Sequence, residues 1–162
     1  MIAMGVRGSI PDLDRFLASV TAMEKRHKAT IQLFRADRIF GMEHLVSAAE
    51  KAQRSFAAGT AMARTLGMEL LLYAAAERQT SEALRKLGIH DGIEEMGLVL
   101  IGDIDGEMAL AELGLERDDS VLEPDCKDFS IFGITEIEID MFGVPGIQGL
   151  VLEKVALSEI ER

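Results

Sequence analysis

The segment MGLVLIGD, residues 96–103, most constrains the fold of this 162-residue chain. It is apolar from Met96 to Ile101 and then changes abruptly to Gly102 and Asp103. Continuous apolar content over so short a run is typical of a strand that is covered on both faces. The segment therefore predicts a buried strand, in a sheet that helices cover.

The segments before this strand alternate between strand-like and helix-like patterns. Strands are expected in IAMGVRG, residues 2–8, and in ATIQLFRA, residues 29–36. Apolar residues at helical spacing predict three helices, over residues 13–27, 41–59 and 63–76. A hydrophobic content of 48% suffices for one core. We therefore predict one small α/β (α+β) domain over residues 1–162, with a short mixed sheet covered by several helices.

Two short helices are expected around this strand. The first covers residues 81–87 and ends at Gly88, which fits the left-handed position that follows many helices. The second lies in DGEMALAELGL, residues 105–115, with Asp105 as its N-cap.

The last third of the chain carries weaker signals. RDDSVLE, residues 117–123, is expected to be a solvated turn that enters an edge strand. Thr135 and Glu138 have the spacing of a capping box, which predicts the start of a helix. GVPGIQG, residues 143–149, is expected to be a loop. Residues 150–162 are expected to form a helix, with a strand as the alternative because β-branched residues recur.

The composition indicates a soluble cytoplasmic protein. The net charge of -11 argues against a broad nucleic-acid interface, because phosphate binding relies on Lys and Arg. The single cysteine, Cys126, excludes an intrachain disulfide and indicates a reducing compartment. The first ten residues lack the basic start of a signal peptide. The longest apolar run, residues 67–76, is too short to span a membrane.

The sequence shows no clear enzyme active site, metal site or cofactor motif. Cys126 has no neighbouring histidine and is expected to be a buried structural residue. His27, His44 and His90 are far apart and are expected at the surface or at helix ends. Asp103 and Asp105 follow the buried strand, where carboxylates could serve a small-molecule enzyme. The favoured interpretation is that Asp105 caps a helix.

The segment ERQTSEALRKLGI, residues 77–89, places polar residues at a break between two helices. A helix that restarts near Thr80 offers free N–H groups and a positive dipole end, which suit an anion. Arg78 and Gln79 would add donors there, and Arg64, Arg85 and Lys86 are close in sequence. The alternative is structural: Thr80 or Ser81 caps the helix, and Arg78 pairs with Glu77 or Glu82.

This segment resembles the signature of the kinase-binding regulatory subunit of the KEOPS complex, the TPRKB or Cgi-one-two-one family, in its short archaeal-type form. Four other segments are similar to the family in the same order. They are ADRIFGMEHLVSAAEKA (36–52), DDSVLE (118–123), FGITEIEI (132–139) and LVLEKVALSEIE (150–161). The resemblance covers nearly the whole chain.

The resemblance implies a non-catalytic subunit without a cofactor. Its complex makes threonylcarbamoyladenosine in tRNAs that read codons starting with A. The subunit would bind and support a kinase-like ATPase, capture the unpaired CCA end of tRNA, and act only indirectly with the threonylcarbamoyl transferase. The alternative is a protein-binding scaffold that makes no RNA contact.

The resemblance also implies the residues of two sites. The tRNA-binding candidates are Arg78 and Gln79, which match the family's Arg-Gln pair, with Thr80, Arg85 and Lys86 beside them. Thr80 stands where the family usually has a larger apolar residue, often isoleucine. The candidates for the kinase contact lie in a C-terminal segment that is apolar on more than one side, and each is also a candidate for the core: Val151, Val155 and Leu157.

Overall fold

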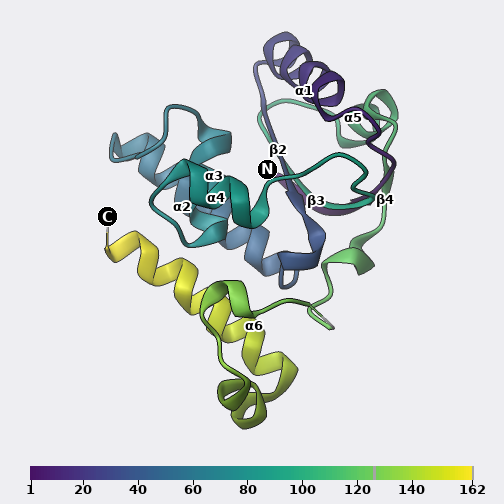
Figure 1. The fold of residues 1–162 in the computed structure, drawn as a ribbon. Coiled ribbons are helices and arrows are strands. Elements are labelled where there is room, and N and C mark those ends of the chain that lie inside the picture. The colour runs from purple at the N-terminus through teal and green to yellow at the C-terminus, as the bar shows by residue number, and fades with distance from the viewer. Residues whose placement is uncertain (126, 162) are drawn as a thin grey trace.

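The computed structural model describes residues 1–125 and 127–161. Within these residues, six α-helices and one four-stranded sheet form an α+β fold, which confirms the predicted class. Figure 1 shows helices on both faces of the sheet, and α6 lying apart from the strands at the C-terminal end of the chain. No helix in the described ranges combines the length and apolar character needed to cross a membrane.

The sheet is antiparallel throughout rather than mixed as predicted. Its strands are β1 (Ile2–Arg7), β2 (Thr30–Arg35), β3 (Glu95–Ile101) and β4 (Glu116–Arg117), in the spatial order β2-β3-β1-β4. β3 lies between β1 and β2 and runs antiparallel to both. The strands β1 and β2, which α1 connects, therefore do not pair with each other, and every strand pair in the described residues is antiparallel.

Helices cover both faces of the sheet. α1 (Leu13–His27) and α5 (Gly106–Leu113) pack on one face, and α2 (Met42–Ala58), α3 (Leu66–Ala75) and α4 (Thr80–Leu87) form a core on the other. In β3, Leu98 and Leu100 face the first layer and Val99 faces the second. This double coverage explains why the segment is apolar without alternation.

Capping residues and glycines mark several of the helix ends. The carboxylate of Asp105 accepts a hydrogen bond from Met108 N–H at 2.8 Å, as expected of an N-cap. Gly59 ends α2 in the left-handed region, with φ of 69°. The prediction for Gly88 is wrong, because its φ of -64° is not left-handed. A Cβ atom at Gly88 would lie 2.4 Å from the carbonyl oxygen of Leu84, so close packing accounts for the glycine.

The turn that follows β4 was only partly anticipated. Residues 118–123 do not enter an edge strand; they follow the short edge strand β4 and contain a 3₁₀ helix, η2 (Asp119–Leu122). The carboxylate of Asp119 accepts a hydrogen bond from Gly5 N–H at 2.9 Å, and Asp118 pairs with Arg7. These contacts hold the turn against β1. Cys126, predicted to be buried, lies outside the described residues.

The C-terminal part of the chain forms an arm, residues 127–161, that packs against α2 and α3. After the short η3 (Ser130–Phe132), a capping box at Thr135 and Glu138 starts α6 (Glu136–Ile160), as predicted. Lys127 anchors the start of the arm by donating hydrogen bonds to the carbonyl oxygens of Ile39 and Val121, at 2.5 and 2.8 Å. Burial lowers the pKa of Lys127 to about 8.

Residues 143–149 are not a loop, which corrects the prediction. They continue α6, which is interrupted only at Gly143, where φ is 69° and ψ is 179°. Pro145 follows this break, in the first turn of the resumed helix, where a missing N–H costs little. The Gly-Pro signal therefore marks a kink. The strand alternative for residues 150–162 is also wrong, since the described residues there are helical up to Ile160.

Candidate functional site

The break between α3 and α4 leaves three polar side chains exposed. α3 ends at Ala75, and Ala76 takes the left-handed conformation with φ of 52°. The N–H groups of Ala76 and Glu77 satisfy the last carbonyls of α3, each at 3.0 Å. Arg78, Gln79 and Thr80 follow and are all exposed, before and at the start of α4.

No side chain caps the start of α4. The N-cap residue is Gln79, and it makes no side-chain capping bond. Thr80 is already the first helical residue, so the predicted capping by Thr80 or Ser81 does not occur. The N–H groups of the first turn therefore have no capping side chain among the described residues, and Arg78 precedes them by two residues, an arrangement that suits an anionic group.

The acidic side chains near Arg78 are engaged with other cations. Glu77 pairs with Lys86, and Glu82 pairs with Arg85 at 2.9 Å. Neither of the two predicted partners of Arg78 contacts it, and Arg78 forms no ion pair with the described residues. Its guanidinium is therefore available to an external ligand.

Arg85 and Lys86 lie in the last turn of α4 and differ in their surroundings. Arg85 is exposed, and its ion pair with Glu82 is a surface pair that is easily exchanged. Lys86 is half-buried, and its ammonium lies 5.9 Å from the ring centre of Phe132 in the C-terminal arm. Lys86 therefore joins α4 to the arm, whereas Arg85 belongs to the open surface.

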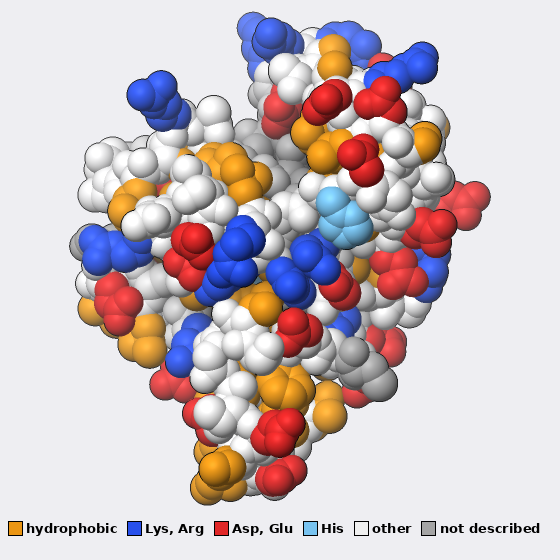
Figure 2. All heavy atoms as spheres, in the orientation of Figure 1, with side chains coloured by type: hydrophobic (Ala, Val, Ile, Leu, Met, Phe, Trp, Pro, Cys, Tyr) orange, Lys and Arg blue, Asp and Glu red, His pale blue; other side chains and the backbone are white. Residues whose placement is uncertain are grey.

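Basic side chains gather on this face of the molecule. Figure 2 shows Lys and Arg side chains across the middle of the view, over the region where Figure 1 places α4. One of the nearby cations is Arg38, whose guanidinium donates a hydrogen bond to the carbonyl oxygen of Lys86 at 2.8 Å. The protein as a whole is acidic, so this basic region is a local feature.

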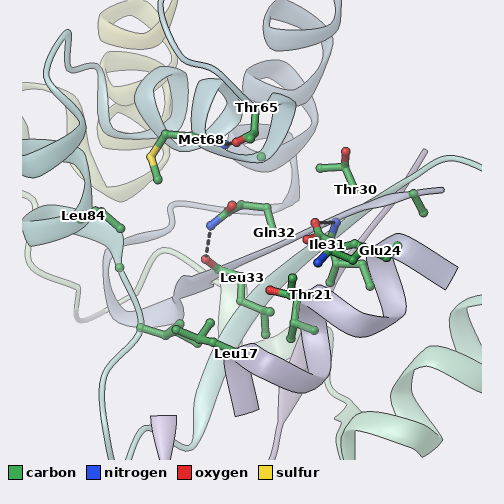
Figure 3. Close-up of a pocket in the computed structure, with 16 residues that line it drawn as sticks. Leu17, Thr21, Glu24, Thr30, Ile31, Gln32, Leu33, Thr65, Met68 and Leu84 are labelled. Atoms are coloured by element: carbon green, nitrogen blue, oxygen red, sulfur yellow. Dashed lines mark hydrogen bonds between the residues drawn. The ribbon is translucent and has the colours of Figure 1, made fainter. Parts of the chain in front are cut away.

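A cleft of about 550 Å³ lies beside α4 and was not predicted. Its floor is the outer edge of β2, and its walls come from α1 on one side and from α3 and α4 on the other. Figure 3 shows Leu84 and Met68 facing Leu17 and Thr21 across it. One residue of the sequence could have pointed to it: Leu84 is an apolar residue of α4 beside the core residues Ala83 and Leu87. In the structure Leu84 is 49% exposed.

Side chains occupy two of the hydrogen-bonding groups along the β2 edge at the floor of the cleft. The carboxylate of Glu24 accepts a hydrogen bond from Ile31 N–H at 2.8 Å, and the amide of Gln32 donates to the carbonyl oxygen of Leu33 at 3.0 Å. Burial raises the pKa of Glu24 above its ordinary value. The edge of β2 is thereby protected from pairing with another strand, while the apolar walls stay accessible.

The three histidines, and the two acids that could have served a small-molecule enzyme, Asp103 and Asp105, form no metal site in the described residues. His27 lies in the last turn of α1 and His90 is exposed, as predicted. His44 lies at a helix end, in the first turn of α2, which is one of the two predicted locations, but it is fully buried, which excludes the surface location. Asp103 is exposed, and Asp105 caps α5. The described residues contain no group of three or more His, Cys, Asp or Glu that could hold a metal.

The three candidates for a kinase contact fall into two classes. Val151 and Val155 are fully buried in the core, and Leu157 is 44% exposed. As the chain is folded here, only Leu157 of the three can touch a partner directly.

The sequence model of a family described as "Kinase binding protein CGI-121" matches residues 14–123, more than half of the chain. The chain belongs to this family. The match begins in α1 and ends just after η2, so it includes the α3–α4 break and three of the four strands, and it leaves α6 outside. No curated protein matches the chain. Membership of a kinase-binding family supports a kinase as a partner of this protein.

Proposed function

We propose that this chain is the non-catalytic, kinase-binding subunit of a KEOPS complex and that it captures the CCA end of tRNA. In this role it binds and supports the kinase-like ATPase in the cytoplasm, and the transferase subunit makes threonylcarbamoyladenosine. The family match supports the kinase partner. The RNA part rests on one observation: Arg78, Gln79 and Thr80 are exposed at the uncapped start of α4, and Arg78 has no ion pair with the described residues.

The surroundings of this segment suit a short unpaired tail of RNA. Arg78 and the N–H groups at the start of α4 can bind phosphates, and Gln79 can bond to base edges or sugar hydroxyls. Arg85 lies five residues beyond Thr80, about 8 Å along the helix axis. The cleft beyond it, with Leu84 and Met68 in its wall, offers apolar surface against which an unstacked base can pack.

The charge balance of the chain is compatible with this small interface. A tail of a few nucleotides needs only a few cations, and the basic region over α4 provides them locally. A net charge of -11 still disfavours wrapping of the duplex parts of tRNA on this subunit. The proposal therefore assigns the rest of the tRNA contact to the partner subunits.

A binding measurement with two RNAs and two variants tests the proposal. Fluorescence anisotropy, at one stated salt concentration, compares a tRNA with its CCA end and the same tRNA trimmed of it. We expect trimming to weaken binding at least about tenfold, and Arg78→Glu to weaken binding of the intact tRNA by a similar factor. Arg15→Glu makes the same charge change on an exposed position of α1 and should change affinity less than about twofold.

The outcomes separate the proposal from its alternative. Equal affinity for the trimmed and intact tRNA would show that the CCA end is not recognised. Absence of any tRNA binding, with binding to the kinase-like subunit retained, would establish the protein scaffold instead.

A further inference from the structure

The side chain of Lys86 is largely enclosed, in contrast to that of its neighbour Arg85. It is 13% exposed, against 63% for Arg85. Its ammonium pairs with the carboxylate of Glu77 and lies 5.9 Å from the ring centre of Phe132. Its carbonyl oxygen accepts a hydrogen bond from Arg38 at 2.8 Å. Lys86 is therefore held by both its side chain and its backbone, and its ammonium has little surface to offer to an RNA phosphate.

The ion-pair partner of Lys86 is the residue directly before Arg78. Glu77 lies in the link between α3 and α4, which pack against each other (Figure 1). Its N–H donates a hydrogen bond to the carbonyl oxygen of Leu72 at 3.0 Å, which fixes its backbone at the end of α3. A carboxylate in this place competes with an RNA phosphate for Arg78, because opposite charges on adjacent residues attract each other. The pair with Lys86 instead directs Glu77 toward the last turn of α4.

The other acid near Arg78 is held less firmly. Glu82 pairs with Arg85 at 2.9 Å within α4, and their side chains are 43% and 63% exposed. Water screens such a surface pair, and it breaks readily. The pair of Glu77 and Lys86 has side chains that are only 25% and 13% exposed, so it is screened less. It also joins two helices, so it is the stronger of the two constraints around Arg78.

We propose that Lys86 is a positioning residue of the RNA site: it holds the carboxylate of Glu77 away from Arg78 and so keeps the guanidinium of Arg78 free for a phosphate of the RNA end. The inference rests on the proposed function for the identity of the ligand. It gives Lys86 a different role from the direct tRNA contact that the family resemblance implies, because Lys86 acts through Glu77 and does not touch the RNA.

A double-mutant cycle on the full chain, with the intact tRNA, tests this role. Lys86→Met removes the charge and keeps an unbranched side chain that can pack on Phe132, and Glu77→Gln removes the carboxylate at nearly constant volume. In fluorescence anisotropy we expect Lys86→Met to weaken binding about tenfold and Glu77→Gln alone to change it less than about twofold. The double variant should bind within about threefold of the wild type, because no carboxylate then competes for Arg78. Lys86→Arg keeps a cation for Glu77 and should also stay within about threefold.

Two outcomes of the cycle would overturn the inference. The first is an equal gain from Glu77→Gln in the wild type and in Lys86→Met, because the two residues would then act independently. The second is a double variant that binds as weakly as Lys86→Met, which would identify Lys86 as a direct phosphate contact. In that case the salt dependence of binding in the double variant would also fall by about one in slope, whereas the positioning role leaves the slope unchanged.

The surface ion pair of Arg26 and Glu112, which joins α1 and α5 on the other face of the sheet, provides the matched control. Arg26→Met, Glu112→Gln and their double variant make the same changes of charge there. All three should bind the tRNA within about twofold of the wild type, because exposed charges at a distance are screened.

A measurement without RNA separates the inference from the proposed function. The NMR resonance of the Arg78 Nε–H should shift in Lys86→Met, because Glu77 then pairs with Arg78, and should return to its wild-type position in the double variant. An unchanged resonance in Lys86→Met would overturn the inference even if tRNA binds as proposed. A wild-type chain that binds no tRNA but shows the expected shifts would overturn the proposed function and leave the positioning of Glu77 by Lys86 established.

Discussion

The buried carboxylate of Glu69 in α3 accepts a hydrogen bond from the hydroxyl of Ser55 in α2, at 3.0 Å. Its second oxygen accepts the N–H groups of Met62 and Ala63, at 3.0 and 2.8 Å. One side chain thereby fixes the connection between two helices that pack against each other. This connection leads into the start of α3, which borders the cleft beside α4.

We expect Glu69→Ala to lower the free energy of unfolding by about 2–4 kcal/mol, because it leaves the N–H groups of Met62 and Ala63 without their acceptor and opens space in the core. Urea denaturation measures this loss. Glu50→Ala removes an exposed carboxylate from α2 and should cost less than about 0.5 kcal/mol. Equal losses for the two variants would show that the buried network contributes nothing.

Protonation of His44 should destabilise the protein at low pH. Its Nδ1 accepts a hydrogen bond from Phe40 N–H at 3.1 Å, so the proton of the neutral ring lies on Nε2 and is donated to the carbonyl oxygen of Ala74 at 2.7 Å. Burial lowers the pKa of His44 from 6.5 to about 4. Below pH 6.5 His44 is therefore protonated in the unfolded chain, whereas in the folded chain it stays neutral until the pH falls to about 4.

The stability contributed by neutral His44 is complete above pH 6.5 and is lost as the pH falls toward 4, by about 3 kcal/mol in total. Urea unfolding at several pH values, for the wild type and His44→Gln, measures it. The variant should be less stable at pH 7 and should lose less stability than the wild type between pH 6.5 and 4. Parallel curves for the two proteins would contradict the assignment.

Gly88 should be intolerant of every side chain, because its close approach to Leu84 leaves no room for a Cβ atom. We expect Gly88→Ala and Gly88→Asn to lose about 1–3 kcal/mol each in urea denaturation. Gly114 is left-handed, with φ of 69° and no atom within 4 Å of an added Cβ, so Gly114→Asn should cost only a few tenths of a kcal/mol. If Gly88→Asn were clearly milder than Gly88→Ala, backbone conformation would be the cause instead.

Thr80→Ile should strengthen the binding of a tRNA end. The side chain is exposed at the first position of α4, and the resemblance to the family implies a larger apolar residue there. Added apolar area for an unstacked base should tighten binding about 3- to 10-fold, which corresponds to about 1 kcal/mol. Anisotropy with the intact tRNA measures this gain. The same change at exposed Thr60 should leave the affinity unaltered, and an equal gain there would indicate a nonspecific effect.

Local signals in the sequence predicted most of the helices and their caps. Asp105, Thr135 and Glu138 were placed correctly because a cap depends on residues three positions apart. The same reasoning failed at residues 143–149, where Gly and Pro suggested a loop. The structure uses them to bend a helix whose two halves are both held by the core.

Features that depend on distant segments could not be predicted in this way. His44 was expected at the surface or at a helix end, and its complete burial at the start of α2 depends on Ala74 and Phe132, which are distant in sequence. The ion pair of Glu77 with Lys86 likewise follows from the path of α4, whereas Glu82 pairs with Arg85 three residues on in the same helix. At the candidate site, Arg78, Gln79 and Thr80 are exposed, and their role in tRNA binding stays a prediction, whereas the cleft depends on the packing of four elements.

The strand order has a consequence for folding during synthesis on the ribosome. β1 and β2 both pair with β3, and neither pairs with the other. The first third of the chain is therefore synthesised with two strands that do not pair with each other. Their shared partner, β3, becomes available only when residues 95–101 leave the ribosome. Until then α1 and α2 can form locally, but no sheet exists to order them. Synthesis of β3 thus sets the earliest moment at which the nascent chain can acquire its native core.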